Sequence, residues 1–308
     1  MNATAISSIV SDGKAAGCRA IDLRVEGGID LRLLPDRGLD AGDAWFGGVK
    51  FSWTSPVGET APVWDDWMKS FGGGLMTTCG LLNVGVPSEG HPQHGEFTYQ
   101  KARVTAVDSL RDGRLEVRGC IAEVGALAHH LEVERVWRTY AGEGLVELED
   151  VLTNRGREPS PALHLYHVNL GPPLWAEGAE LVLDARATHP RDDDAAPYAD
   201  SWHRAPGVIE DARERVFEHE VSPDGDGWCS ATVRNRNLGL EVTVGWDAST
   251  LPRLWQWVHP APGIGVLGIE PANCSVLGVA HDRAEGTLPE LMPGEARRTR
   301  LQIRAGRL

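Results

Sequence analysis

The sequence has no excess of basic side chains. Lys and Arg together number 30 against 44 Asp and Glu, and the formal net charge of the 308 residues is −14. Arginine outnumbers lysine but is scattered along the chain, whereas a phosphate backbone or an anionic membrane is bound by clustered cations. We therefore expect neither a nucleic acid nor a membrane as a partner.

Long apolar runs and paired cysteines are missing as well. No run approaches the roughly 18 apolar residues that span a bilayer, and residues 1–17 lack the basic region and apolar core of a secretory signal. The cysteines form no CxxC pair, and their wide spacing fits reduced thiols better than a disulfide framework or a zinc site: Cys18, Cys79, Cys120, Cys229 and Cys274. We expect a cytoplasmic protein.

Long helices are also excluded, because 36 glycines and 19 prolines interrupt the chain. No Gly-rich strand-to-helix turn of the dinucleotide-binding or P-loop kind is present, and we expect no cofactor. What the chain does contain is a succession of β-type runs separated by turns: 18–25, 28–34, 113–124, 130–140, 145–154, 227–235, 238–247 and 296–305.

These antiparallel runs predict an all-β fold, a large β-sandwich with little helix. The composition shows no break, so we treat residues 1–308 as one domain. Residues 35–95 stand apart as a long segment rich in glycine, tryptophan and polar residues. We interpret this segment as loop-rich and as the part of the chain that builds a site.

Two short apolar segments carry polar residues that a core does not need. PALHLYHVNLG contains His164, His167 and Asn169, and GVLGIEPANC contains Glu270. An imidazole and a carboxylate on neighbouring strands form a general acid/base pair. Such a pair suits sugar mutarotation, in which a base removes the proton of the anomeric hydroxyl while an acid protonates the ring oxygen. Apolar surroundings would raise the pKa of Glu270 toward the working pH.

Further short blocks are spread over most of the chain. Taken with the two segments above, they are HLYHVNLG, GIEPANC, LPELMPGEARR, RGLDAGDAWFGGV, SPVGE, FGGGLMTTCGLLNVGVP and HGEF. In their number and order they resemble the aldose 1-epimerase (galactose mutarotase-like) superfamily, and most closely a bacterial branch of it whose function is unknown.

The resemblance implies a β-supersandwich that binds a sugar in a concave face of the sheet and uses a His acid and a Glu base. Glu270 matches the position of the base. His167 fits the YHVNLG form of this branch, whereas His164 aligns with the NHSYFNL form of true galactose mutarotases. We favour His167 as the acid, and the choice between the two stays open. His94 matches a substrate-binding histidine.

The chain departs from the family pattern directly after His94. The branch commonly shows HGR, whereas Glu96 stands at the third position here. A carboxylate in place of a cation disfavours an acidic or phosphorylated sugar near this point. The identity of the substrate is therefore not given by the resemblance.

Five further residues are candidate sugar ligands: Arg37, Asn169, His164, Gln256 and Trp67. The indole of Trp67 lies in the polar loop VWDDWMK and suits stacking on a sugar face. Each candidate has a structural alternative, since a histidine on a half-buried strand usually bonds to the backbone and Arg37 could tie strands together. His91 and His94 have no second ligand pair of recognisable spacing, so we expect no metal.

The leading hypothesis is a carbohydrate-active isomerase, an aldose 1-epimerase-like enzyme that uses His167 and Glu270 at the anomeric centre of a free sugar. Two alternatives stay open. One is another sugar isomerase or an eliminating lyase on the same scaffold, with or without a metal. The other is a non-catalytic carbohydrate-binding or sensing protein. The sequence fixes neither the sugar nor the oligomeric state, for which a homodimer is one candidate.

Overall fold

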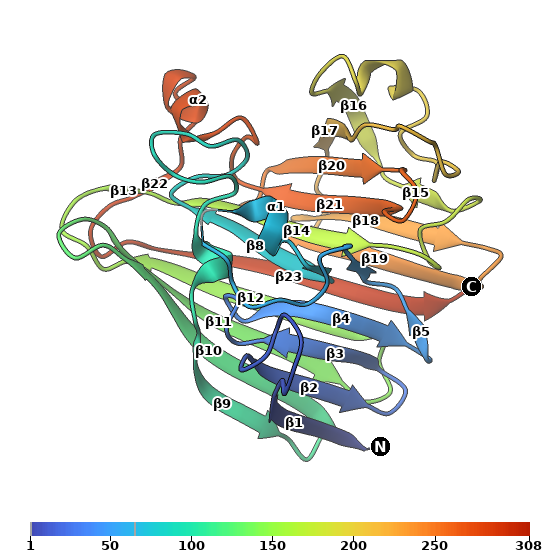
Figure 1. Ribbon diagram of the computed structural model, residues 1–308, viewed down its shortest axis with the longest axis horizontal. Helices are drawn as coiled ribbons and strands as arrows, with labels where there is room; N and C mark the ends of the chain where they lie inside the picture. The colour runs from blue at the N-terminus through green and yellow to red at the C-terminus, as the bar shows by residue number, and fades with distance from the viewer. Residues whose placement is uncertain (1, 65) are drawn as a thin grey trace.

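The computed structural model describes residues 2–64 and 66–308. Within these residues two large antiparallel sheets make up most of the protein (Figure 1). The larger sheet has eleven strands in the described residues, and β5 (Val49–Lys50) pairs with its strand β4. The other strands follow in this spatial order: β1 (Ala3–Ile9), β2 (Arg19–Val25), β3 (Ile29–Leu34), β4 (Asp40–Phe46), β8 (Met76–Leu81), β14 (Leu163–Leu170), β21 (Val266–Ala272), β20 (Arg253–His259), β17 (Arg215–Val221) and β16 (Ala185–Pro190).

The smaller sheet has eight strands in the same described part of the chain. Their spatial order is β15 (Glu180–Val182), β18 (Trp228–Asn235), β19 (Leu240–Asp247), β23 (Ala296–Arg307), β12 (Leu145–Asn154), β11 (His130–Tyr140), β10 (Arg114–Val124) and β9 (Arg103–Ser109). The short elements are β6 (Trp53–Thr54) with β7 (Gly73–Gly74), β13 (Ser160–Pro161) with β22 (Glu290–Leu291), α1 (Trp67–Ser70), α2 (Val279–Ala284), η1 (Phe97–Tyr99) and η2 (Ala196–Tyr198). The prediction of a large antiparallel all-β fold with little helix is confirmed.

Two hydrophobic clusters lie on the two faces of the larger sheet. The main core fills the space between the sheets and joins residues of both, such as Leu31 on β3 and Trp246 on β19. The second cluster covers the outer face, which is the face turned away from the smaller sheet, and includes Leu165, Phe71 and Trp67. Strands such as β14 are therefore buried on both sides, and their burial does not alternate along the strand.

The segment 35–95 contains two strands that the sequence does not reveal. β4 and β8 lie inside the larger sheet, where β8 separates β4 from β14. All six residues of β8 are buried, so its sequence MTTCGL lacks the period-two pattern of a half-exposed strand. Much of the remaining segment runs over the outer face and brings α1 and Phe71 into the second cluster.

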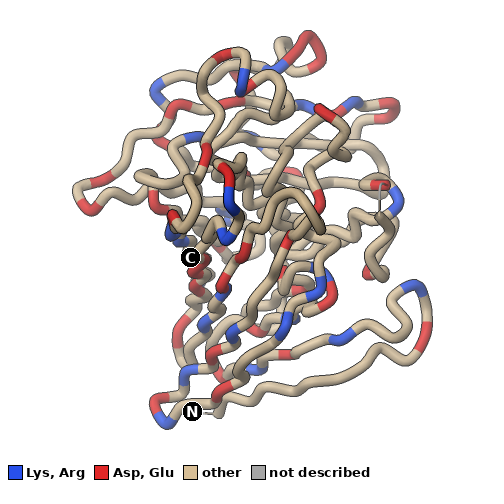
Figure 2. The backbone as a smooth tube through the Cα atoms, turned by 90° about the vertical axis from the view of Figure 1, so that its left-hand side faces the viewer, with Lys and Arg blue, Asp and Glu red and all other residues tan. Residues whose placement is uncertain are grey.

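Charged side chains of both signs alternate over the surface, and Figure 2 shows Lys and Arg interspersed with Asp and Glu along the chain. Many are ion pairs, such as the one between Arg253 and Glu218 at 2.6 Å and the one between Arg300 and Asp247 at 2.7 Å. No helix in residues 2–64 and 66–308 is long and apolar enough to cross a membrane.

Candidate active site

Strand β14 places its two histidines on opposite faces of the larger sheet. The strand lies between β8 and β21, and all eight of its residues are buried. Tyr166 points to the smaller sheet, because its hydroxyl donates to Asp150 on β12 at 2.8 Å. Since side chains alternate along a strand, His164 shares the face of Tyr166, whereas His167 and Asn169 face the outer side.

Glu270 on β21 lies directly beside His167. The strand register pairs Val168 with Ile269. The neighbouring residues His167 and Glu270 therefore lie opposite each other, on the outer face. His167 Nε2 and Glu270 Oε1 are 3.2 Å apart. Gly268 leaves the room for this contact, because a Cβ at its position would lie 2.5 Å from Glu270 Oε1 and 3.2 Å from His167 Cε1.

Burial leaves both members of this pair uncharged near pH 7. The loss of water raises the pKa of Glu270 to about 8. It lowers the pKa of His167 to about 3, and the neighbouring His94 adds to the lowering. Only 5% of His167 and 3% of Glu270 are exposed. Besides the ring N–H of neutral His167, the pair therefore carries one titratable proton, which resides on Glu270, and the basic ring nitrogen of His167 is free to accept a proton.

Aromatic rings close the outer side of the pair. The ring centroids of Phe71 and Trp257 lie 5.2 and 5.3 Å from that of His167. Trp67 stacks on Phe71 at 4.5 Å and lies 4.4 Å from His94, whose ring is 6.1 Å from His167. Flat apolar surfaces of this kind exclude water and can stack on the C–H face of a sugar.

Several buried polar atoms at this place have no hydrogen-bond partner among the described residues: His94 Nδ1, His167 Nδ1, Asn169 Oδ1 and Glu270 Oε1. The 3.2 Å contact between His167 and Glu270 lacks the alignment of a hydrogen bond. Asn169 is held in place, because its amide donates to the His167 carbonyl at 2.9 Å. Buried polar groups are normally paired, so this group of atoms is arranged to receive a polar ligand.

His164 and Gln256 do not reach the pair. The His164 ring stacks on Tyr166 at 5.2 Å on the face that points to the smaller sheet. Gln256 on β20 is paired in register with Ile269, a member of the main core, and its side-chain oxygen lies 2.8 Å from His219 Nε2. Neither side chain is therefore placed to contact a ligand at the His167–Glu270 pair.

Arg37 lies apart from the pair and holds the segment that covers it. Its guanidinium donates to the Ser70 carbonyl at 2.8 Å, to the Ser70 hydroxyl at 3.1 Å and to the Thr60 carbonyl at 3.3 Å. These bonds tie the turn after β3 to the end of α1. Arg37 thus positions Trp67 and Phe71 through the backbone and makes no contact with the His167–Glu270 pair itself.

Phe71 and Trp257 are site residues that the sequence does not single out. Phe71 opens the FGGG run, and Trp257 is one of 11 tryptophans, most of which are expected in the core. Trp257 could have been found by alternation along β20, because Trp255 is paired in register with Glu270 and lies on the same face as Trp257. No comparable signal marks Phe71, which lies in an irregular segment.

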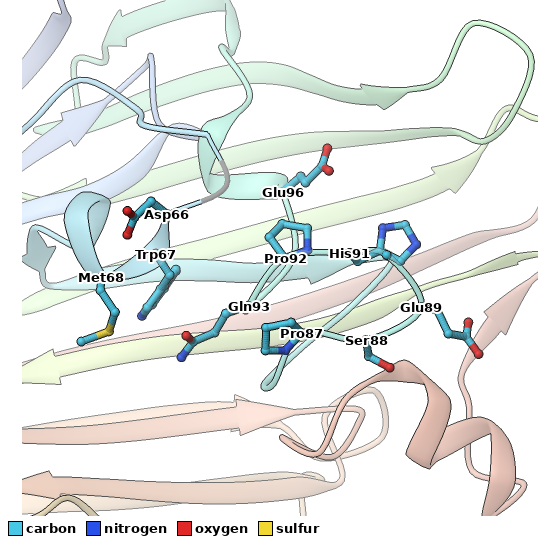
Figure 3. Close-up of a pocket in the computed structure, with 11 residues that line it drawn as sticks. Asp66, Trp67, Met68, Pro87, Ser88, Glu89, His91, Pro92, Gln93 and Glu96 are labelled. Atoms are coloured by element: carbon cyan, nitrogen blue, oxygen red, sulfur yellow. The ribbon is translucent and has the colours of Figure 1, made fainter.

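A cavity of about 660 Å³ adjoins the site (Figure 3). Trp67 and Met68 of α1 line one side, and the loop of residues 87–96 lines the other. Trp67 belongs both to the cavity and to the ring cluster around His167. Among the described residues, no group of three His, Cys, Asp or Glu side chains is arranged to hold a metal ion.

Solved structures of low sequence identity share this fold. A protein of Klebsiella pneumoniae, provisionally assigned as an aldose 1-epimerase, is 22% identical with a TM-score of 0.90 over 98% of this chain and 87% of its own. A galactose mutarotase-like protein of Clostridium acetobutylicum is 13% identical with a TM-score of 0.71, over 99% of both chains. The galactose 1-epimerase of Lactobacillus acidophilus is 13% identical with a TM-score of 0.62, also over 99% of both. No curated protein matches the chain.

These likenesses show that the chain has the galactose mutarotase-like fold that the resemblance in the sequence implies. A family model described as a domain of unknown function (DUF4432) matches residues 15–305. That span includes His94, His167 and Glu270 and covers nearly the whole chain. The chain therefore belongs to the DUF4432 family, a family of unknown function with the galactose mutarotase-like fold.

Proposed function

We propose that the protein is an isomerase that exchanges the anomers of a free sugar, with His167 and Glu270 as its acid/base pair. The observation that carries the proposal is the 3.2 Å contact between His167 Nε2 and Glu270 Oε1 in a buried place with unpartnered polar atoms. Catalytic pairs are commonly built from groups whose surroundings shift their pKa values away from the ordinary ones. The structural likeness to sugar epimerases is in keeping with this chemistry.

Anomer exchange needs one proton donor and one proton acceptor. In ring opening, the base removes the proton of the anomeric hydroxyl, the bond between C1 and the ring oxygen breaks, and the acid protonates that oxygen. Rotation about the C1–C2 bond and the reverse transfers close the ring on the other face. The pair carries one proton, so it can supply both groups in every cycle without a cofactor.

Before a sugar binds, this proton resides on Glu270, because the pKa of Glu270 is about 8 and that of His167 is about 3. Moving it to His167 requires that the two side chains, 3.2 Å apart, first align as a hydrogen bond, and the transfer gives the His acid and Glu base that the family resemblance implies. Polar groups of a bound sugar favour that charged arrangement, because they replace the hydrogen bonds that burial removes. Both arrangements contain the same number of protons.

A sugar reaches the pair when Trp67 and Phe71 move aside, since these rings lie over His167. His94 Nδ1 and Asn169 Oδ1 then offer hydrogen bonds to sugar hydroxyls, because neither atom has a partner in the described part of the protein. The aromatic rings, once displaced, are suited to stacking on the ring of the sugar. We assign Trp67, His94 and Asn169 as substrate-binding residues on these grounds.

The test is the rate of anomer exchange for a panel of aldoses, measured by NMR magnetisation exchange and by polarimetry. We expect acceleration by the wild-type protein and a loss of about 10²–10⁴-fold in Glu270→Gln and in His167→Asn. Glu285→Gln, an exposed carboxylate near α2, is the matched control and should retain full activity. Sugar binding without exchange would instead identify a carbohydrate-binding protein. Activity that a chelator abolishes and a divalent cation restores would favour a metal-assisted sugar reaction.

A further inference from the structure

The cavity beside Trp67 combines flat apolar side chains with hydrogen-bonding groups. Trp67, Met68 and Pro92 supply apolar surface, and Gln93 and Glu96 supply polar atoms (Figure 3). Its volume of about 660 Å³ falls within the roughly 300–1,000 Å³ of small-molecule sites. Apolar platforms flanked by amide and carboxylate groups fit the C–H faces and hydroxyls of a saccharide unit.

The charges around the cavity disfavour an anionic ligand. Asp66 pairs with Lys69 at 2.6 Å, and Glu89 pairs with Arg283 at 3.1 Å, so both cations are already bound. The Glu96 side chain makes no ion pair with any residue that the structure describes. A phosphate or carboxylate in the cavity would therefore meet an unpaired negative charge, whereas a neutral saccharide would not.

The Trp67 ring lies between the cavity and the candidate catalytic pair. The Trp67 ring lines the cavity and lies 6.5 Å from the ring of His167. Gln93 lines the cavity, while the next residue, His94, turns its ring toward Trp67 and His167. The displacement of the Trp67 ring that the proposed function requires would therefore join the space at the pair to the cavity, with the displaced indole beside both parts of a longer ligand.

We propose that this cavity is a second sugar subsite, and that the substrate is a neutral saccharide of two or more units. Its reducing ring lies at His167 and Glu270, and the next unit lies in the cavity against Trp67 and Gln93. This inference rests on the proposed function, since it names the substrate class of the same site. It assigns Gln93 and Glu96 as residues that determine specificity rather than as groups that take part in proton transfer.

The test compares glucose with maltose, cellobiose and lactose, which all carry glucose at the reducing end. We expect kcat/KM for anomer exchange to be about tenfold higher for at least one of these disaccharides than for glucose, the effect of ~1.4 kcal/mol of added binding. In Gln93→Ala this ratio should fall about fivefold, through the loss of one hydrogen bond. Gln302→Ala, on β23 of the smaller sheet, is the matched control and should keep the wild-type ratio.

Equal kcat/KM for glucose and all three disaccharides, with the same ratio in Gln93→Ala, would overturn the subsite and leave the proposed function standing. Absence of exchange for every sugar would count against the proposed function instead. In that case the subsite is still tested by ligand-observed NMR with maltose. Binding that Gln93→Ala weakens supports the subsite, and absence of binding overturns it.

Discussion

Two neighbouring residues of β14 contact two buried polar groups that differ in their hydrogen bonding. Tyr166 faces the smaller sheet and bonds to Asp150, which together with Asp40 pairs with Arg135. His167 faces outward and meets Glu270. Both groups are buried, but the first is satisfied by hydrogen bonds and the second has unpartnered atoms.

The Arg135 group is built for stability. The guanidinium donates to Asp150 at 2.6 and 2.9 Å, to Asp40 at 2.7 Å, to Thr78 at 2.8 Å and to the Gly38 carbonyl at 2.9 Å. A ligand would find no free bonding atom on this side chain. The comparison indicates that several unpartnered atoms gathered next to a cavity distinguish the candidate site from this structural network.

The largest effect is expected where the satisfied group is broken. Arg135→Met should lower the free energy of unfolding by about 3–5 kcal/mol, because Asp40 and Asp150 would be left buried without their cation. Urea unfolding followed by fluorescence measures this loss. The control Arg111→Met changes an exposed arginine and should stay within about 0.5 kcal/mol. A small loss in Arg135→Met would show that the network is not a source of stability.

At the unsatisfied pair, replacing the titratable carboxyl group of Glu270 should raise stability at neutral pH instead of lowering it. The pKa of Glu270 is raised to about 8, so its contribution to stability is present at low pH and is lost as the pH rises from about 4.5 to 8. In Glu270→Gln this loss is absent, and the stability of the variant relative to wild type should grow by about 1.4 kcal/mol per pH unit over that window. Urea unfolding near pH 5 and pH 7.5 measures the difference. Parallel pH profiles would mean that Glu270 is ionised in the folded protein.

The rate of anomer exchange should depend on pH through the protonation of Glu270 and His167. Between the pKa of His167 at about 3 and that of Glu270 at about 8 the pair keeps one proton. We expect a flat pH profile of kcat/KM through neutral pH and a tenfold fall per unit above about pH 8, where Glu270 loses that proton. Stopped-flow polarimetry with the spontaneous rate subtracted measures this profile. A rate that rises through pH 8 would contradict the one-proton pair.

The smallest effect is expected on the inner face of β14. His164→Phe replaces a ring that stacks on Tyr166 and lies 6.3 Å from Phe97, and it should change the free energy of unfolding by less than about 1.5 kcal/mol. Exchange should stay within about threefold of wild type. His167→Phe, the matched change on the outer face, should abolish exchange. Equal losses in both variants would remove the distinction between the two faces.

Much of the fold follows from the sequence because the smaller sheet is made of half-buried strands. The β-type runs predicted within 113–154 and 227–247 correspond to β10–β12 and to β18–β19, where buried and partly exposed residues alternate. The strands β4 and β8 could not be read in the same way. They are covered on both faces, so their sequences contain no period that separates them from the loops around them.

Some residues of the candidate site stand out in the sequence, but its geometry does not. His167 and Glu270 are marked by polar groups within apolar runs, and Trp67 by its polar surroundings. Which face His164 takes depends on the strand register against β8 and β21, which sequence alone does not contain. Gln256 forms hydrogen bonds with Trp202 and His219, and Arg37 forms hydrogen bonds with Ser70. Only the three-dimensional arrangement brings these partners close.

The pairing of β14 with β21 also dictates when the pair can form during synthesis. His167 and Glu270 are about a hundred residues apart, so at about 5–20 residues per second the ribosome releases the second roughly 5–20 s after the first. Until β21 has been synthesised, the edge of β14 that faces away from β8 has no neighbouring strand. If the proposed function holds, a nascent chain cannot bind its sugar before then, and sugar binding would report that β20 and β21 of the larger sheet have docked.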